Sequence, residues 1–273
     1  MKLIDCFQVL VILAICLMMS SVYADSTALY YYTIGVQSAA QGKFPEAKTA
    51  FDQALLVDPQ SHPVQRCLLI LVDVKNKQIK KQTAVHLFRG FSSFNRYRAD
   101  EAILELNKAI ELDAQYAITY SHRADAYKDK GQFQEAHADY GKALELAPRY
   151  ATAYLNRANL YADNSDFDRA IADYKRALEV EPGNILAYYS RGNTYAKQGR
   201  YEQAIADYNA LLEISPLYPH AYIRMGLAYE KLDRTKDALA IYKAYLQKLD
   251  LQKQDQRQAM WVQEKVKSLE KQP

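Results

Sequence analysis

The sequence has little glycine, proline or cysteine and almost no net charge. Its 273 residues include nine glycines, eight prolines and three cysteines, and so few turn-forming residues argue against a chain of many short strands. The formal charge is +3, and no block of like charges is long enough to indicate a nucleic-acid-binding surface. An apolar content of 49% excludes an intrinsically disordered chain and is enough for a sizeable core.

The sequence also lacks the motifs of common catalytic and metal sites. Its five histidines are scattered and form no HExxH or other ligand spacing. There is no glycine-rich phosphate loop and no GxSxG nucleophile elbow. We therefore expect no enzymatic activity, no metal and no cofactor.

The first 24 residues are typical of a secretory signal peptide. "MKLID" carries Lys2, "VLVILAICLMM" is an eleven-residue apolar run, and "SVYA" places small residues at Val22 and Ala24. Eleven apolar residues are too few to cross a hydrocarbon core about 30 Å thick. We expect cleavage after Ala24 and a periplasmic or secreted protein. The alternative is an uncleaved inner-membrane anchor that uses the longer stretch from Cys6 to Val22.

Cleavage would leave one cysteine. Cys6 and Cys16 lie in the segment to be removed, so Cys67 could form no internal disulfide. Cys67 lies in "CLLILV", where we expect it to be a small buried hydrophobic residue.

The sequence superimposes on itself when it is shifted by 34 residues. Alanine occupies position 20 of every copy, and position 8 is always glycine or alanine. Thirteen of the 23 tyrosines fall at positions 4, 11 and 24, which indicates packing rather than a ligand surface. The six copies are 28–61, 83–116, 117–150, 151–184, 185–218 and 219–252.

These residues resemble the tetratricopeptide repeat, with its aromatic-x₂-L-G-x₂-Y…A-x₃-F…A…P pattern. Together with the expected signal peptide, they resemble an exported bacterial member of this family. The resemblance implies an all-α fold, a right-handed superhelical solenoid of helix-turn-helix repeats. Small residues at positions 8 and 20 would let the two helices of a hairpin approach closely. Because the repeat has no chemistry of its own, the resemblance also implies a binding scaffold.

Two segments fall outside the repeat frame. Residues 62–82 read as one extra buried helix followed by a basic turn, and they should change how the first repeat docks. Residues 253–273 read as a polar capping helix, with Trp261, Val262, Val266 and Leu269 facing inward. The second copy is also irregular, because Tyr97 replaces the usual turn glycine.

Position 7 is arginine in four copies, and only these copies have an acid at position 23. The other two copies have apolar residues at both positions, Ile34 with Ala50 and Met225 with Ile241. A partly buried ion pair inside each repeat explains why the two positions change together. The expected structural ion pairs are Arg89 with Glu105, Arg123 with Asp139, Arg157 with Asp173, and Arg191 with Asp207.

The resemblance allows the family's carboxylate clamp to be tested. The corresponding positions hold Leu155, Asn159, Ser190, His220 and Arg224. Only Asn159 and Arg224 agree with the clamp, so recognition of a chaperone tail is not expected.

Repeat geometry places positions 2, 5, 9, 12 and 13 of each first helix on a concave groove. Aromatic and amide side chains there suit an extended protein or peptide segment. The groove candidates are Phe91, Phe94, Asp125, Asn159, Tyr189, Asn193 and Arg224. Alternatively, the helix near 62–82 covers Phe91 and Phe94.

The leading function is therefore a non-catalytic interaction scaffold that binds a partner in this groove. The runner-up is a membrane-anchored envelope assembly factor that uses its convex face. A third hypothesis is an enzyme that binds carbohydrate or cell wall.

Overall fold

The computed structural model describes residues 26–59, 61–94, 98–252 and 256–270, and the regular elements in these ranges are all helices. The segment expected to be a signal peptide lies outside them. No helix in the described ranges is both long and apolar enough to cross a bilayer. A first helix covers 26–40, and the others are α2 (Phe44–Val57), α3 (His62–Lys75), α4 (Lys81–Phe94), α5 (Ala99–Leu112), α6 (Ala117–Asp129), α7 (Phe133–Leu146), α8 (Ala151–Asp163), α9 (Phe167–Val180), α10 (Ile185–Lys197), α11 (Tyr201–Ile214), α12 (Pro219–Lys231), α13 (Thr235–Gln252) and α14 (Gln256–Leu269).

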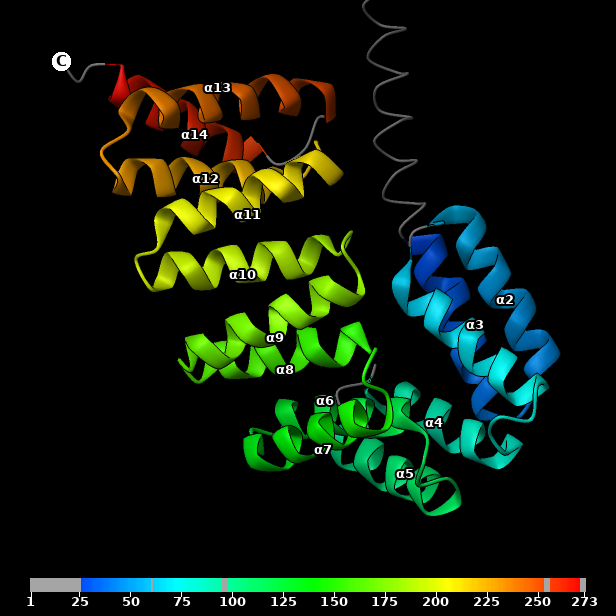
Figure 1. The fold of residues 1–273 in the computed structure, drawn as a ribbon. Helices are drawn as coiled ribbons and strands as arrows, with labels where there is room; N and C mark the ends of the chain where they lie inside the picture. The colour runs from blue at the N-terminus through cyan, green and yellow to red at the C-terminus, as the bar shows by residue number, and fades with distance from the viewer. Residues whose placement is uncertain (1–25, 60, 95–97, 253–255, 271–273) are drawn as a thin grey trace, which may run out of the picture. The chain divides into compact units, whose positions relative to one another are not determined.

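The chain divides into two compact units. The N-terminal unit is Met1–Leu146 and the C-terminal unit is Ala147–Pro273. In the C-terminal unit each repeat copy forms one hairpin, α8 with α9, α10 with α11 and α12 with α13. Each hairpin packs on the next through α9 with α10 and α11 with α12, so the hairpins stack (Figure 1).

Local signals in the sequence explain where these helices begin. The side chain of Asn184 caps α10 by accepting a hydrogen bond from the backbone N–H of Ala187 at 3.0 Å. Pro219 opens α12, where the missing N–H costs nothing because the first turn has no helical acceptor for it.

A large residue at position 24 packs on the small residue at position 8 within each hairpin. A Cβ atom added to Gly192 would lie only 2.7 Å from Cε1 of Tyr208, and one added to Gly90 would lie 2.9 Å from Cγ of Leu106. The ring of Tyr208 is fully buried. The requirement for a small residue at position 8 therefore comes from the side chain facing it on the second helix.

Helix α14 covers the end of the C-terminal unit by packing on α13. Val262 and Leu269 are buried, as expected for its inner side. Trp261 differs from the expectation because it is 37% exposed, although its ring makes an edge contact with that of Tyr242, at 6.1 Å between centroids.

The added helix α3 reverses the direction of the first helix relative to α4 in the N-terminal unit. The Nε atom of Arg89 donates to the carbonyl oxygen of Ala40 at 3.2 Å, and Gly42 lies beside Val85 near the start of α4. The first helix therefore runs antiparallel to α4. One helix inserted between two hairpins produces this reversal, and it places the first repeat in a different orientation from a regular copy.

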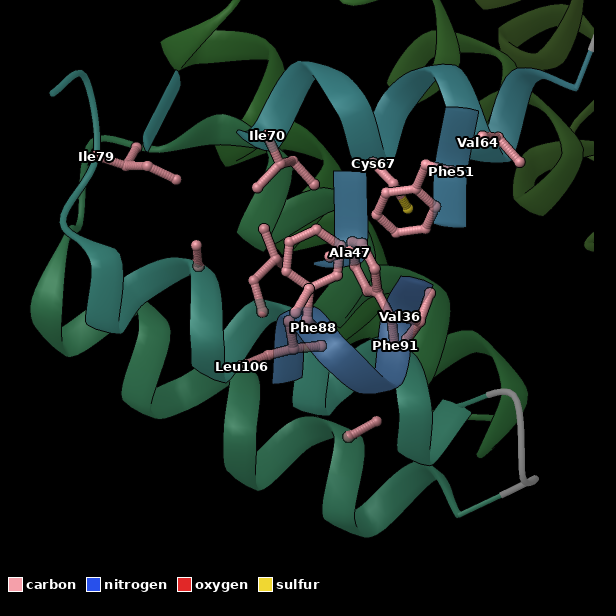
Figure 2. Packing of buried hydrophobic residues seen from close by; sticks show 14 of the residues in the cluster. Val36, Ala47, Phe51, Val64, Cys67, Ile70, Ile79, Phe88, Phe91 and Leu106 are labelled. Atoms are coloured by element: carbon pink, nitrogen blue, oxygen red, sulfur yellow. The ribbon is translucent and has the colours of Figure 1, made fainter. Parts of the chain in front are cut away.

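Helix α3 buries one face in the core of the N-terminal unit. Figure 2 shows Val64, Cys67 and Ile70, spaced three residues apart, pointing toward aromatic rings. These rings belong to Phe51, Phe88 and Phe91. Cys67 is 1% exposed, and burial raises the pKa of its thiol to about 12, so it behaves as the small hydrophobic residue expected.

Position 15 of the repeat has positive φ in every hairpin turn of the C-terminal unit. Gly199 occupies it at 75°, but Ser165 and Asp233 occupy it at 61° and 56°. This conformation costs a residue with a side chain about 1–2 kcal/mol.

We therefore predict that Ser165→Gly raises the free energy of unfolding by about 1 kcal/mol, because glycine removes the steric penalty but adds chain entropy. Urea unfolding measures the change. The reverse substitution, Gly199→Ser, is the matched control and should be destabilising, since only backbone strain opposes a Cβ atom there. Equal or lower stability of Ser165→Gly would contradict the assignment.

Candidate partner-binding face

Three of the expected ion pairs lie inside their hairpins with two hydrogen bonds each. In each pair the Nε and Nη2 atoms of arginine donate to the two carboxylate oxygens of aspartate. The aspartates are only 5–7% exposed. The distances are 2.6 and 2.7 Å for Arg123 with Asp139, 2.6 and 2.9 Å for Arg157 with Asp173, and 2.9 and 2.6 Å for Arg191 with Asp207.

The electrostatics of Arg191 show that its charge is satisfied within the fold. Burial disfavours the charged guanidinium, but the hydrogen bonds and charge of Asp207 outweigh this and raise the pKa of Arg191 above its ordinary value. Its guanidinium also lies 5.7 Å from the ring centre of Tyr188. Arg191 is thus a structural residue.

In the fourth pair the charged groups are farther apart, and the arginine is half-exposed. The Nη1 atom of Arg89 is 3.9 Å from Oε2 of Glu105, and the arginine side chain is 47% exposed. Glu105 contacts Lys108 Nζ at 2.7 Å and His86 Nδ1 at 2.8 Å. Burial would raise the pKa of Glu105, but these contacts hold it below its usual value. Arg89 instead donates a hydrogen bond to the carbonyl oxygen of Ala40, at the end of the first helix that runs antiparallel to α4.

The two asparagines at position 9 of the C-terminal unit are held by buried tyrosines. The hydroxyl of Tyr174 donates to Oδ1 of Asn159 at 2.6 Å, and the hydroxyl of Tyr208 donates to Oδ1 of Asn193 at 2.8 Å. Both asparagines are partly exposed on the first helices α8 and α10. Neither Nδ2 atom has a hydrogen-bond partner among the residues described, so the N–H donors of both amides are available.

In two other repeats an acid accepts the hydrogen bond of the tyrosine at position 24, from position 9 in one and position 12 in the other. The hydroxyl of Tyr140 donates to Asp125, which therefore belongs to the internal network of the N-terminal unit rather than to a free surface. In the last repeat Glu230 accepts from the hydroxyl of Tyr242 at 2.6 Å and from Lys265 of α14 at 2.7 Å.

Tyr189 lies beside Tyr208, and Arg224 follows His220 by one turn of α12. The ring of Tyr189 is 6.3 Å from that of Tyr208 and 5.5 Å from that of Tyr218, which in turn is 6.1 Å from His220. Burial raises the pKa of Tyr208, and the positive charge of nearby Arg224 opposes the shift. Arg224 is exposed and has no ion-pair partner within the ranges that the structure describes.

The prediction that Phe91 lies on an open groove is wrong. Phe91 is 8% exposed, and its ring contacts Phe88 at 5.5 Å and His122 at 4.2 Å. Phe91 shares one hydrophobic cluster with Val64, Cys67 and Ile70 of α3, which agrees with the alternative that the extra helix contributes to its cover. His122 is neutral here, because burial and then the charge of Arg66 on α3 lower its pKa to about 3. The side chain of Phe94 lies outside the described residues.

The N-terminal unit contains a pocket that the sequence did not indicate. It has a volume of about 380 Å³ and lies between the first helix, α4 and α5. Its charged groups are largely paired, for example Arg98 with Glu101. The lining residues are Ala40, Arg89, Ser92, Ser93, Arg98, Glu101, Leu104 and Glu105. In the described part of the chain no three acidic, histidine or cysteine side chains are grouped so that they could hold a metal ion.

The stacked hairpins define a helical-repeat protein, and comparisons with known proteins identify the repeat. The sequence model described as "Tetratricopeptide repeat" matches residues 123–185, 155–219 and 189–253. Residues 123–253 therefore belong to this family, and the chain is a tetratricopeptide repeat protein.

Solved structures of similar fold include two crystal structures of MamA. One is 25% identical, with a TM-score of 0.58, and the match covers 63% of this chain and 94% of that one. The other is 26% identical, with a TM-score of 0.56 and coverage of 59% and 94%. YrrB, described as a tetratricopeptide repeat protein with an unusual peptide-binding site, is 19% identical, with a TM-score of 0.54 and coverage of 71% and 97%, and shares the fold. Comparison with curated proteins gives no match.

The buried pair of Arg191 and Asp207 leads to a double-mutant prediction. Asp207→Ala should lower the free energy of unfolding by about 3–5 kcal/mol, because it leaves the arginine buried without its partner. Arg191→Met combined with Asp207→Ile should restore most of the loss, since the last repeat holds Met225 and Ile241 at these positions. Urea unfolding of Arg191→Met, Asp207→Ile and their double variant measures the coupling.

Arg89→Met is the control for this cycle. Its exposed, long contact with Glu105 should be worth only about 0–1 kcal/mol. A double variant of Arg191 and Asp207 no more stable than the worse single variant would contradict the pairing.

Proposed function

We propose that this protein is a non-catalytic interaction scaffold that binds an extended peptide segment on the first-helix face of its C-terminal unit. By the first-helix face we mean the side formed by α8, α10 and α12 that carries Asn159, Asn193 and Arg224. The observation that carries the proposal is the pair of amides whose oxygens are engaged by buried tyrosines. The membership of the tetratricopeptide repeat family supports it, as does the peptide-binding site named for YrrB.

Preorganised amide donors suit a peptide backbone. An extended peptide presents carbonyl oxygens at regular intervals, and each needs a donor once it leaves water. The tyrosine hydroxyls fix the orientation of Asn159 and Asn193 before a ligand arrives, so little side-chain entropy is lost on binding. The same tyrosine–asparagine hydrogen bond occurs in two successive repeats, which suits a ligand that crosses one first helix after another.

The test removes the donors while keeping the internal hydrogen bonds. In the Asn159→Asp, Asn193→Asp double variant each carboxylate can still accept from its tyrosine, as Asp125 does from Tyr140. The fold should therefore persist while binding is lost. We expect the purified wild-type chain to enrich binders from a display library of random linear dodecapeptides. The double variant should bind the selected peptides at least about tenfold more weakly.

Arg176→Glu is the control variant, because Arg176 is exposed on the second helix α9. It should bind the selected peptides as the wild type does, and circular dichroism should show equal helicity in all three proteins. If the aspartate double variant retained the peptides and Arg176→Glu released them, the partner would bind the second helices. This result would favour an assembly factor acting through its convex face.

We also propose that the protein is exported, because residues 1–24 have the pattern of a cleaved signal peptide. N-terminal sequencing of the protein from the secreted or periplasmic fraction should begin at Asp25. A protein that keeps Met1 or Lys2 and sediments with membranes would contradict cleavage and indicate the anchored alternative.

A further inference from the structure

Three aromatic rings form a partly exposed shelf beside the asparagine donors. Tyr189, Tyr218 and His220 lie in series, with ring centres 5.5 and 6.1 Å apart. Tyr189 and Tyr218 stand at positions 5 and 34, outside the positions whose tyrosines pack the hairpins. Leu217, next to Tyr218 in the chain, and Leu186, on the same helix as Tyr189, are also exposed, at 44% and 48%. Tyr189 and Tyr218 pack partly on the core of the C-terminal unit, and the exposed parts of their rings form the shelf.

A free positive charge accompanies this shelf. The arginines at position 7 are neutralised by their own aspartates, but Arg224 at position 6 of the last repeat is exposed and without an ion-pair partner among the described residues. Arg224 follows His220 of the shelf by four residues on α12, so the two side chains are neighbours on the same face of that helix. The guanidinium therefore lies next to the aromatic shelf.

We propose that the shelf of Tyr189, Tyr218 and His220 is a subsite for an aromatic side chain of the bound segment, and that Arg224 binds a carboxylate two residues away from it. The inference rests on the proposed function and specifies its ligand: an extended segment with an aromatic and an acidic residue at i and i+2.

The spacing follows from one turn of α12. Residues four apart on a helix have Cβ atoms about 5–6 Å apart, which sets the separation of Arg224 from His220 of the shelf. In an extended chain residues i and i+2 project to the same side, about 6–7 Å apart. An aromatic ring would stack or meet the shelf edge to face, and the guanidinium can hold a carboxylate with two parallel hydrogen bonds. Asn193 would donate to the intervening backbone.

The experiment selects peptides from the random dodecapeptide library on four purified chains: wild type, Arg224→Glu, Tyr218→Leu and Arg176→Glu. Wild type and the Arg176→Glu control should both enrich an aromatic residue two positions from an acid. The Arg224→Glu variant should keep the aromatic residue and exchange the acid for lysine or arginine. The Tyr218→Leu variant should keep the acid and lose the aromatic preference.

Synthetic peptides then measure the two contributions separately. Replacing the acid of a selected peptide by its amide should weaken binding to the wild type about tenfold and leave binding to Arg224→Glu unchanged or stronger. Replacing the aromatic residue by leucine should weaken binding to the wild type but not to Tyr218→Leu. Circular dichroism checks the fold of each variant, and Arg224→Glu changes an exposed side chain, so it tests the inference even if Tyr218→Leu fails to fold.

The outcomes separate this inference from the proposed function. Enriched peptides without the aromatic and acidic pair, or the same peptides on wild type and Arg224→Glu, would overturn the subsite while leaving peptide binding intact. Enrichment no greater than on an unrelated helical protein would overturn both.

Discussion

The buried tyrosine at repeat position 24 connects the packing of each regular hairpin to its first-helix face. Its ring fills the space beside position 8, and its hydroxyl reaches a polar side chain at position 9 or 12. A buried hydroxyl without a partner is costly, so a tyrosine at position 24 requires an oxygen on the first helix. The last repeat has Leu227 at position 9, and there Glu230 at position 12 provides the oxygen instead.

The two N-terminal repeats show the converse, because they lack both the tyrosine at position 24 and the polar residue at position 9. Their residues at position 24 are Phe51 and Leu106, which have no hydroxyl, and their residues at position 9 are the apolar Val36 and Phe91. Without a phenol to satisfy, the first helix can be apolar, and both residues are buried. The chemistry of position 24 thus determines whether the first-helix face is polar or is available for packing against another helix.

Comparison of the repeats with one another made much of the fold predictable from the sequence. It located the hairpins and the arginine–aspartate pairs, because both depend on contacts within one copy. The phenol bond to Asn159 and Asn193 could have been found in the same way, since five of the six copies have either a polar residue at position 9 with tyrosine at position 24 or apolar residues without a hydroxyl at both. The last repeat, with Leu227 and Tyr242, is the exception. The burial of Phe91 could not be settled, because it depends on the docking of α3, a helix without a counterpart in the other copies. The long distance between Arg89 and Glu105 has the same origin, because α3 reverses the direction of the first helix relative to α4.

These differences favour the C-terminal unit as the place for the proposed ligand. In the N-terminal unit, a segment that bound beside Phe91 would have to open the hydrophobic cluster that Phe91 shares with α3. It would thereby expose Val64, Cys67 and Ile70, whose burial contributes roughly 25 cal/mol per Å² of apolar surface. On the first-helix face of the C-terminal unit, neither the asparagine Nδ2 atoms nor Arg224 has a partner among the described residues that the proposed ligand would have to displace. Binding there would exchange water for peptide groups without opening the core.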